Sequence, residues 1–239
     1  MSGTLYLLPC PIAAAPLDAA LPAEVAAIAR RTEYFLVENA KSARAFLKQL
    51  GHPRPLRELA ITEIGHAPRA ADIAGWLAPL ASGSDVAVVS EAGCPGIADP
   101  GGTLVAAAHA AGWRVRPLVG PSSILLALMA SGLDGQRFRF HGYLPVAPEA
   151  RAASLKALER ESRTRGETQV FIETPYRGAA LFDAVLETCA RSTRLAVAAD
   201  LTGPDEHVGM RTVEAWTACP ADRRPVLQRR PAVFCLLAS

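Results

Sequence analysis

Short apolar runs alternate with longer, alanine-rich segments through the first half of the chain. The apolar runs are rich in β-branched residues, as strands are, and lie at residues 4–8, 34–37, 59–64, 85–89 and 114–118. The segments between them repeat apolar residues at helical spacing and predict helices at residues 23–31, 42–50, 69–80 and 103–111. Alternation of this kind predicts βαβ units and a largely parallel sheet.

The second half of the chain continues the alternation after a break. We expect a helix at 122–131 that Gly132 ends, and a strand at 138–141. The stretch L-P-V-A-P at 144–148 then interrupts the periodicity with two prolines, as a linker does. Further helices are expected at 149–160 and 178–190, and further strands at 168–172, 194–198, 208–213 and 232–237. We therefore predict an α/β fold with two α/β domains, residues 1–145 and 146–239.

Composition places the chain among folded globular proteins. Of its 239 residues 50% are hydrophobic and 20% are charged, which is far from the composition of disordered chains. A net charge of +2 permits an RNA partner without indicating one. Two groups of arginines fit phosphate contacts, although a solvated face or loop is the explanation that we favour. They are Arg160, Arg163 and Arg165, and Arg223, Arg224, Arg229 and Arg230.

The cysteines and the apolar runs exclude other classes of protein. The five cysteines form no C-x-x-C pair and no metal-ligand spacing with the histidines, so we expect reduced thiols and no metal site. The first 30 residues do not resemble a secretory leader, and no apolar run approaches the roughly 20 residues that span a bilayer. We therefore expect a cytoplasmic protein without membrane contact.

The most informative stretch is S-E-A-G-C-P-G-I-A-D-P-G-G at 90–102, directly after an expected strand. It contains four glycines and two prolines. Parallel α/β sheets bind ligands at the carboxyl ends of their strands, and glycine lets a backbone approach a ligand closely. A plain strand-to-helix turn is the alternative, but such turns commonly need only about two to six residues. The length of the stretch therefore favours a ligand-binding loop.

Four further stretches lie at the ends of expected strands. They are L-P-C-P at 8–11, G-P-S-S at 120–123, E-T-P-Y-R at 173–177 and D-L-T-G-P-D-E-H at 200–207. The serines of G-P-S-S cap a helix equally well with or without a ligand. The last stretch concentrates three carboxylates and a histidine, which suits acid–base chemistry, although turns also favour Asp, Gly and Pro.

Motifs of several common enzyme classes are missing. The sequence contains no G-x-x-x-x-G-K-[ST], no G-x-G-x-x-G after the first strand, no H-E-x-x-H and no G-x-S-x-G. These absences argue against Walker-type hydrolysis, ordinary dinucleotide binding, zinc hydrolysis and α/β-hydrolase chemistry. The residues alone thus lead to an α/β protein with a glycine-rich ligand cleft between two domains.

The order of these stretches resembles the tetrapyrrole-methylase superfamily, and within it the branch that methylates a ribose 2′-oxygen of 16S ribosomal RNA. The resemblance covers roughly residues 3–237 and rests on V-S-E-A-G-C-P-G-I-A-D-P-G at 89–101, G-P-S-S at 120–123, S-G-L at 131–133 and F-H-G-Y-L-P at 140–145. It implies an S-adenosylmethionine-dependent methyltransferase with S-adenosylhomocysteine as product. It also implies a homodimer, and a cofactor held in a cleft between the two domains.

The resemblance further implies which residues form the site. The cofactor-contacting positions carried over to the first domain are Pro9, Ser90, Glu91, Ala92, Gly93, Ile97, Asp99, Ser122 and Ser123. Those carried over to the second domain are Glu173, Thr174, Leu201 and Ala232. A hydroxyl acceptor needs a base to remove its proton, and the matched candidates are Glu38, Glu91 and Asp200. Methyl transfer of this type requires no metal.

The departures from the RNA-methylating branch lie on the acceptor side. P-I-A-A at 11–14 stands where that branch reads P-I-G-N, E-N-A-K at 38–41 where it reads E-D-T-R, I-E-T-P-Y-R at 172–177 where it reads Y-E-S-P-H-R, and A-D-L-T-G at 199–203 where it reads R-E-L-T-K. Two cationic side chains are missing from the last stretch. Three hypotheses therefore stay open: a methyltransferase acting on RNA, one acting on a tetrapyrrole or another small molecule, and a cofactor-binding module without catalysis.

Overall fold

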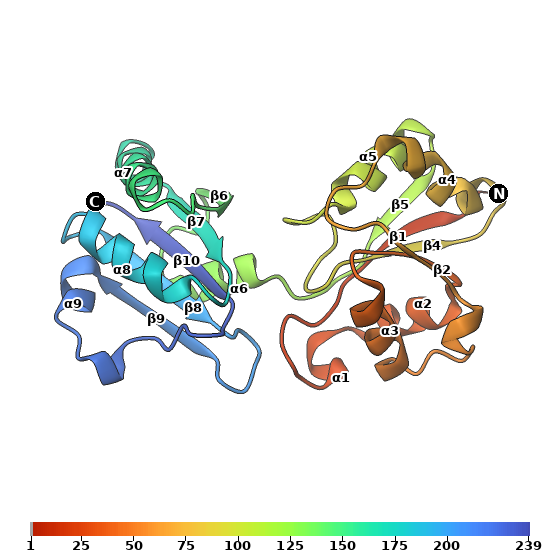
Figure 1. Ribbon diagram of the computed structural model, residues 1–239, viewed down its shortest axis with the longest axis horizontal. Coiled ribbons are helices and arrows are strands. Elements are labelled where there is room, and N and C mark those ends of the chain that lie inside the picture. The colour runs from red at the N-terminus through yellow and green to blue at the C-terminus, as the bar shows by residue number, and fades with distance from the viewer. Residues whose placement is uncertain (1) are drawn as a thin grey trace. The chain divides into compact units, whose positions relative to one another are not determined.

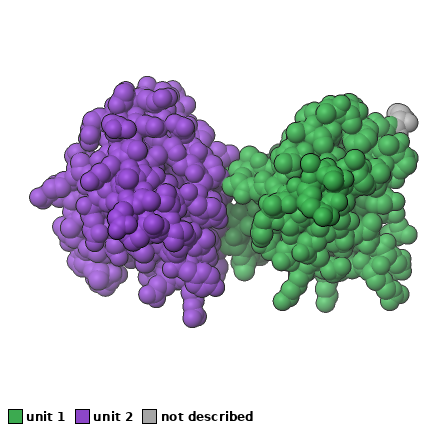
Figure 2. Space-filling model, turned by 45° about the horizontal axis from the view of Figure 1, so that its top comes forward, with its two compact units in different colours: residues 1–122 green, residues 123–239 purple. Residues whose placement is uncertain are grey.

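The computed structural model describes residues 2–239 and is shown in Figure 1. The chain forms two compact units, coloured separately in Figure 2: unit 1 ends at Ser122, and unit 2 comprises Ser123–Ser239. Each unit has its own sheet and its own apolar core. The α/β class and the two-part organisation agree with the sequence pattern.

Unit 1 is built on a sheet whose described strands are all parallel and lie in the order β3-β2-β4-β1-β5. The strands are β1 (Thr4–Leu8), β2 (Tyr34–Val37), β3 (Ala60–Glu63), β4 (Val86–Val89) and β5 (Arg114–Pro117). In β1, Leu5 is paired with Val86 on one side and Val115 on the other. The sheet therefore has the largely parallel topology that the alternating pattern predicted.

Helices cover both faces of this sheet. They are α1 (Leu17–Ala20), α2 (Ala23–Arg31), α3 (Ala40–Gln49), α4 (Ala70–Ala81) and α5 (Gly101–Ala110), with a 3₁₀ turn η1 (Leu56–Glu58) before β3. Successive residues of a strand point to opposite faces. Accordingly, Leu8 packs in one apolar cluster with Ile28 of α2 and Leu47 of α3, whereas Leu5 packs in another with Leu80 of α4.

Unit 2 contains a mixed sheet, whose described strands lie in the order β6-β7-β10-β8-β9. The strands are β6 (Phe138–Tyr143), β7 (Thr168–Glu173), β8 (Arg194–Ala199), β9 (His207–Thr212) and β10 (Ala232–Leu237). Strand β6 runs parallel to β7, and the other pairings are antiparallel. Because β10 runs against both β7 and β8, its first residue lies beside the last residues of those two strands.

The core of unit 2 is more aromatic than that of unit 1. Its helices are α6 (Ser123–Ser131), α7 (Pro148–Arg165), α8 (Gly178–Thr188) and α9 (Val213–Thr217), with a 3₁₀ turn η2 (Ala221–Arg223). Phe171 of β7 and Phe234 of β10 stack with centroids 5.5 Å apart, and Phe182 meets Trp216 edge to face. The buried indole of Trp216 donates to the carbonyl of Leu195 at 2.9 Å, so its polar atom is satisfied.

The division between the units differs from the expected boundary after residue 145. Helix α6 packs on β10 and β8, and β6 pairs with β7, so both elements belong to unit 2 and not to the first domain. The proline-containing stretch at 144–148 is not a linker, because Leu144 is buried in the core of unit 2. The prolines interrupt periodicity inside a domain, where Pro145 precedes α7 and Pro148 is the first residue of that helix.

Side-chain caps explain two differences in the expected elements. Helix α3 begins at Ala40, two residues before the expected start, because the Asn39 side chain accepts the N–H groups of Lys41 and Ser42 at 2.9 and 3.2 Å. The strand expected at 208–213 ends at Thr212, whose hydroxyl caps α9 by accepting the Ala215 N–H. Within residues 2–239 no helix is long and apolar enough to cross a membrane.

Candidate functional site

Five loops leave one edge of the unit 1 sheet. They begin at Pro9 after β1, Glu38 after β2, Ile64 after β3, Ser90 after β4 and Leu118 after β5. Because these strands are parallel, their carboxyl ends share that edge, which we call the carboxyl edge of unit 1. Open α/β sheets bind their ligands in this position.

The loop after β4 is fixed to the loop after β1. Cys10 and Gly93 exchange two backbone hydrogen bonds, of 2.9 and 3.1 Å, outside the named strands. The Ser90 hydroxyl donates to the carbonyl of Ala92 at 3.2 Å and turns the loop back on itself. Gly93 has φ +74°, a conformation that glycine adopts without steric cost. The backbone of this loop is therefore held in one shape before any ligand arrives.

Asp99 closes the second half of the same loop. Its Oδ1 accepts the backbone N–H groups of Gly96 at 2.6 Å and Gly101 at 2.8 Å. Its Oδ2 is buried and has no hydrogen-bond partner among residues 2–239. Burial raises the pKa of Asp99 and the charge of Glu38 raises it further, whereas the two N–H groups and the nearby Ser90 hydroxyl lower it. Asp99 thus shapes the loop with one oxygen and offers the other as an unused acceptor.

The loop after β5 approaches the loop after β1 so closely that only glycine fits. A Cβ atom on Gly120 would lie 2.2 Å from Cβ of Pro9. The Cys94 thiol contacts the same place, since it donates to the carbonyls of Gly120 at 3.5 Å and Pro121 at 3.3 Å. Three loops, after β1, β4 and β5, therefore form one packed group at the carboxyl edge.

A chain of polar contacts joins the loop after β2 to this group. Oε2 of Glu38 accepts the Glu91 N–H at 3.0 Å, and Oε1 of Glu38 lies 2.8 Å from Nδ1 of His66. The Ser42 hydroxyl donates to Oε1 of Glu91 at 3.1 Å. The two catalytic candidates of unit 1, Glu38 and Glu91, are thus neighbours.

Unit 2 has a comparable edge where β7 and β8 end and β10 begins. Ala232 is paired with Glu173 on one side and Ala199 on the other. Glu173 is buried, and its Oε1 accepts the Thr174 N–H at 2.6 Å and lies 2.7 Å from Nη2 of Arg177. The predicted residues of the second domain therefore lie at or just beyond the ends of three neighbouring strands, and Leu201 among them is buried.

The carboxylate of Asp200 shapes a turn in unit 2. Asp200 has φ +49°, its carbonyl accepts the Gly203 N–H at 2.8 Å, and its Oδ2 accepts the Asp205 N–H at 3.1 Å. A Cβ on Gly203 would lie 2.4 Å from that Oδ2, so this turn also requires glycine. The contacts assign Asp200 a structural role that the sequence did not predict.

A family comparison matches most of these elements. Residues 17–215, from α1 to α9, match the family model described as Tetrapyrrole (Corrin/Porphyrin) Methylases. The chain belongs to this family. The expectation drawn from the sequence motifs is confirmed at this level, although Pro9 and Ala232 lie outside the matched residues.

Curated tetrapyrrole methylases similar to this chain include two proteins named ribosomal RNA small subunit methyltransferase I. The protein from Xylella fastidiosa is 41% identical over 174 residues, 72% of this chain and 59% of the relative. The protein from Micromonospora olivasterospora is 36% identical over 205 residues, 86% of this chain and 61% of the relative. The chain thus spans about three fifths of the length of these relatives.

A solved tetrapyrrole methylase shares the fold. The crystal structure of uroporphyrin-III-C-methyltransferase from Thermus thermophilus superposes with a TM-score of 0.54 at 21% sequence identity. The likeness covers 99% of this chain and 93% of that chain. At this identity the likeness concerns the fold alone.

The structure gathers the predicted site residues into two groups. Unit 1 brings together Pro9, Glu38, Ser90, Glu91, Ala92, Gly93, Ile97, Asp99 and Ser122, all in loops at its carboxyl edge. Ile97 is 55% exposed, a large fraction for an apolar side chain. Unit 2 contains Ser123 at the start of α6, and Glu173, Thr174, Asp200, Leu201 and Ala232 at the edge described above.

Sequence reasoning missed His66, which follows β3 and contacts Glu38. Cys10 lies in the stretch L-P-C-P that the sequence did identify, but its backbone pairing with Gly93 was not predicted. The signal for His66 was its position just beyond an expected strand, the same rule that identified the other loops. Its neighbours Gly65 and Ala67 form no motif, so the position alone did not stand out.

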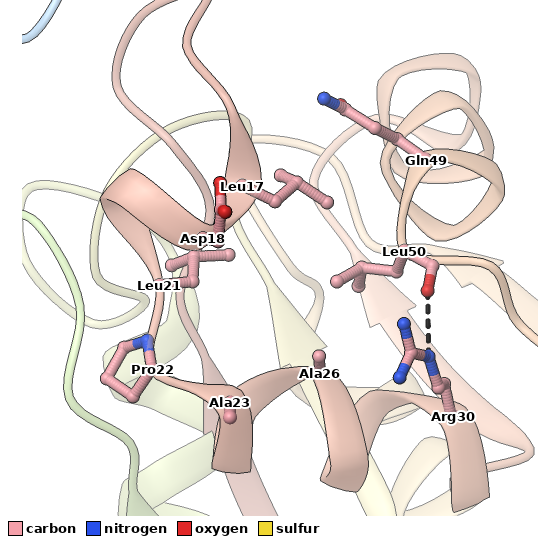
Figure 3. A pocket seen from close by; sticks show the side chains of 9 residues that line it. All are labelled: Leu17, Asp18, Leu21, Pro22, Ala23, Ala26, Arg30, Gln49 and Leu50. Carbon is pink, nitrogen blue, oxygen red and sulfur yellow. Dashed lines mark hydrogen bonds between the residues drawn. The ribbon is translucent and has the colours of Figure 1, made fainter.

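The cavity shown in Figure 3 lies elsewhere in unit 1. It has a volume of about 550 Å³ and lies between α1, α2 and the end of α3, with Leu17, Leu21 and Leu50 in its wall. Arg30 donates from Nε to the Leu50 carbonyl at 2.8 Å across its rim. None of the predicted site residues lines it. No cluster of His, Cys, Asp and Glu suited to a metal occurs within residues 2–239.

Proposed function

We propose that this tetrapyrrole methylase is an S-adenosylmethionine-dependent methyltransferase whose acceptor is a ribose 2′-hydroxyl of small-subunit ribosomal RNA. The names of its curated relatives support methyl transfer to small-subunit ribosomal RNA, and the motif resemblance suggests the ribose 2′-hydroxyl. The cofactor assignment rests on Asp99, because its two carboxylate oxygens differ in their contacts. Oδ1 closes the loop, and Oδ2 is buried without a partner among the described residues.

The residues of unit 1 fit the chemical groups of the cofactor. A buried, unused carboxylate oxygen suits an N–H, hydroxyl or ammonium donor, all of which S-adenosylmethionine carries. At the same carboxyl edge, Gly120 lies close to Pro9 and Gly93 has a positive φ. Because neither glycine has a Cβ atom, their backbone can approach a ligand closely. We propose that the unit 1 group binds the cofactor through Pro9, Ser90, Glu91, Ala92, Gly93, Ile97, Asp99 and Ser122. The contributions of Ser123, Glu173, Thr174, Leu201 and Ala232 remain predictions from the motifs.

When bound, the cofactor supplies an activated methyl group on a sulfonium. Transfer is an in-line displacement, so the main task of the protein is to align donor and acceptor at near-attack distance. Loops that hydrogen bonds hold in one shape, as at Ser90, Gly93 and Asp99, suit that task. A hydroxyl acceptor also needs a base, and Glu38, Glu91 and Asp200 remain the candidates from the motifs.

The RNA acceptor is the function that we favour over a small-molecule acceptor. Several arginines of the two basic groups are held by local contacts: Arg163 donates to the Ser239 carbonyl, Arg224 to the Cys219 carbonyl, and Arg230 pairs with Asp205. Arg223 and Arg229 are exposed, and no described residue accepts a hydrogen bond from their side chains or pairs with them. They are the arginines of the second group that are free to contact phosphate.

We further propose a homodimer with α6 in its interface. On this helix Leu125 is 51% exposed and Met129 is 79% exposed, and Met210 on the neighbouring β9 is 41% exposed. Contiguous exposed apolar side chains favour an association surface. Light scattering should give the mass of a dimer for the wild type. It should give the mass of a monomer for Leu125→Ser with Met129→Ser; a wild-type monomer would exclude this assembly.

Calorimetric titration tests the cofactor assignment. The wild type should bind S-adenosylmethionine and S-adenosylhomocysteine at one site, and Gly93→Leu and Asp99→Ala should lose binding while circular dichroism shows a folded protein. Gly102→Ala is the matched control, because a Cβ at Gly102 meets no atom within 4 Å. Wild-type affinity in both Gly93→Leu and Asp99→Ala would exclude the proposed site.

A methyl-transfer assay then tests the acceptor. Undermethylated small ribosomal subunits and a tetrapyrrole such as uroporphyrinogen III are offered separately with labelled cofactor. Label on RNA that resists base hydrolysis at one ribose supports the proposal, whereas label on the tetrapyrrole supports the small-molecule alternative. If neither acceptor releases S-adenosylhomocysteine above the Gly93→Leu background, the binding module without catalysis becomes the better hypothesis.

A further inference from the structure

His66 lies beside the catalytic candidates although no motif includes it. It follows β3 by three residues, and its Nδ1 is 2.8 Å from Oε1 of Glu38. Its side chain is 80% exposed, and Nε2 has no hydrogen-bond partner within residues 2–239. One ring nitrogen is therefore held by a carboxylate, and the other faces solvent at the carboxyl edge of unit 1.

The contacts of Glu38 suit a residue that orients His66 better than a base that accepts the proton itself. Its side chain is only 15% exposed, and both of its oxygens are engaged, Oε1 with His66 and Oε2 with the Glu91 N–H at 3.0 Å. Its own N–H donates to the Val89 carbonyl at 3.1 Å, which ties it to the end of β4. A carboxylate anchored in this way orients a histidine, as the third member of a nucleophile–base–acid arrangement does.

The geometry fixes the tautomer of the neutral imidazole. Oε1 of Glu38 is an acceptor, so Nδ1 of His66 carries the proton and Nε2 keeps its lone pair. The acidic groups near the ring are Glu38 and Asp99, the exposed Glu91 whose carboxylate accepts the Ser42 hydroxyl, and Glu63 at the end of β3, whose Oε2 accepts the Ala40 N–H. Arg69, in the same loop as His66, is a cation whose Nε lies 2.7 Å from Oδ2 of Asp72.

We propose that His66 is the general base of the methyl transfer and that Glu38 is its positioning residue. This inference rests on the proposed function, because it needs a hydroxyl acceptor. Nε2 of His66 takes the proton from the acceptor hydroxyl while the oxygen forms its bond to the methyl carbon. The bond between that carbon and sulfur breaks, and its electron pair stays on sulfur as a neutral thioether. The imidazolium then returns its proton to water.

A surface ion pair is the competing explanation. Exposed pairs contribute little to stability, so His66 would then matter neither for folding nor for turnover. The two explanations differ in what happens when His66 is replaced by a residue of similar polarity. A surface ion pair predicts no loss of turnover, whereas a general base predicts loss of turnover with intact folding and intact cofactor binding.

The kinetic test compares His66→Gln with His109→Gln. His109 is exposed on α5, and the site described above does not include it, so its substitution controls for loss of an exposed histidine. We expect His66→Gln to lower kcat on undermethylated small subunits by about 100-fold or more. The acid limb of the pH–rate profile should disappear with it, and affinity for S-adenosylhomocysteine should stay unchanged. Added imidazole should restore at least about a tenth of the lost rate in His66→Ala, which a structural role does not explain.

A spectroscopic test needs neither cofactor nor turnover. Long-range ¹H–¹⁵N spectra of the free protein, with the His66 signals assigned from the His66→Gln spectrum, report the tautomer directly. The wild type should show Nδ1–H, and Glu38→Gln should change the tautomer population and lower kcat by about tenfold or more. A wild-type Nε2–H tautomer would overturn the dyad.

The outcomes separate this inference from the proposed function. If the wild type methylates RNA and His66→Gln keeps the wild-type kcat and pH profile, His66 is not the base and the proposed function stands. If the wild type methylates no acceptor, the proposed function and the role of His66 fail together, whatever the tautomer. Loss of turnover in both His66→Gln and His109→Gln would also overturn the specific role of His66.

Discussion

The Cβ atom that Gly120 lacks would lie 2.2 Å from Cβ of Pro9. Real Cβ atoms do not approach so closely, so Gly120→Ala must separate the loops after β1 and β5. We expect the unfolding free energy to fall by about 1–3 kcal/mol, as for overpacked cores, and cofactor affinity to fall at least about tenfold. Urea denaturation and calorimetric titration measure the two effects.

The control for this prediction is Gly102→Ala, which lies in helix α5 and has open space around its Cβ. It should gain up to about 1 kcal/mol of stability, because alanine favours a helix over glycine. Wild-type affinity in Gly120→Ala would mean that the contact between the loops after β1 and β5 is irrelevant to the cofactor.

Asp99 makes stability depend on pH in a direction that its environment determines. Burial raises the pKa of Asp99 above its ordinary value, so the unfolded chain releases this proton at a lower pH than the folded protein does. This residue therefore lowers the unfolding free energy as the pH rises through the window between the two pKa values. Asp99→Asn removes the ionisation, and its stability relative to the wild type should improve as the pH rises.

Urea denaturation of the wild type and Asp99→Asn at about pH 4.5 and about pH 7 measures this difference. The amide oxygen of asparagine can still accept the N–H groups of Gly96 and Gly101. A difference that is independent of pH would contradict the raised pKa. Because Oδ2 is assigned to the cofactor, Asp99→Asn should also bind S-adenosylmethionine more weakly than the wild type.

The central strands of unit 1, β1, β2 and β4, were predictable because burial on both faces gives them a local signature. The runs at 4–8 and 34–37 coincide with β1 and β2. Where side chains act on the backbone, the pattern was less informative. Periodicity could not place the start of α3 at Ala40, since the capping contact of Asn39 is a hydrogen bond and not an apolar repeat. The proline stretch misled for a similar reason, because Leu144 is buried by tertiary packing that no local pattern records.

The candidate site was predictable as a set of loops but not as a set of contacts. The rule that ligands meet the carboxyl ends of parallel strands identified the loops after β1, β4 and β5. Family motifs added Glu38, but neither argument reveals that both of its oxygens are occupied. His66 and the structural use of Asp200 depend on side-chain distances between segments remote in sequence, which a single sequence does not contain.

Asp200 is a candidate base whose structural and chemical roles one substitution separates. Asparagine tolerates the positive φ of this position, and its amide oxygen can accept the Asp205 N–H. Asp200→Asn should therefore fold normally and, since we assign the base to His66, keep kcat within about threefold of the wild type. A loss of about 100-fold or more with unchanged stability would instead make Asp200 the base.

His207 should weaken the fold in mild acid. Burial lowers the pKa of His207 below its ordinary value of 6.5, and the charge of Arg230 lowers it further. Its Nε2 is buried without a partner among the described residues, and Gly209 keeps the space beside it, since a Cβ there would lie 3.1 Å from that nitrogen. Protonation in the folded state would therefore bury a positive charge next to a guanidinium.

The direction of the pH effect follows from this lowered pKa. Above 6.5 both the folded and the unfolded His207 are neutral, and the residue contributes no pH dependence. As the pH falls below that value, His207 becomes protonated in the unfolded chain but stays neutral in the folded protein. The unfolding free energy therefore decreases with falling pH until the pKa of the folded state is passed. His207→Gln should remove this part of the decrease, and Arg230→Gln should reduce it while also breaking the pair with Asp205. Urea denaturation at about pH 7.5 and about pH 5 measures this loss of unfolding free energy. An equal loss in the wild type and His207→Gln would contradict the lowered pKa of His207.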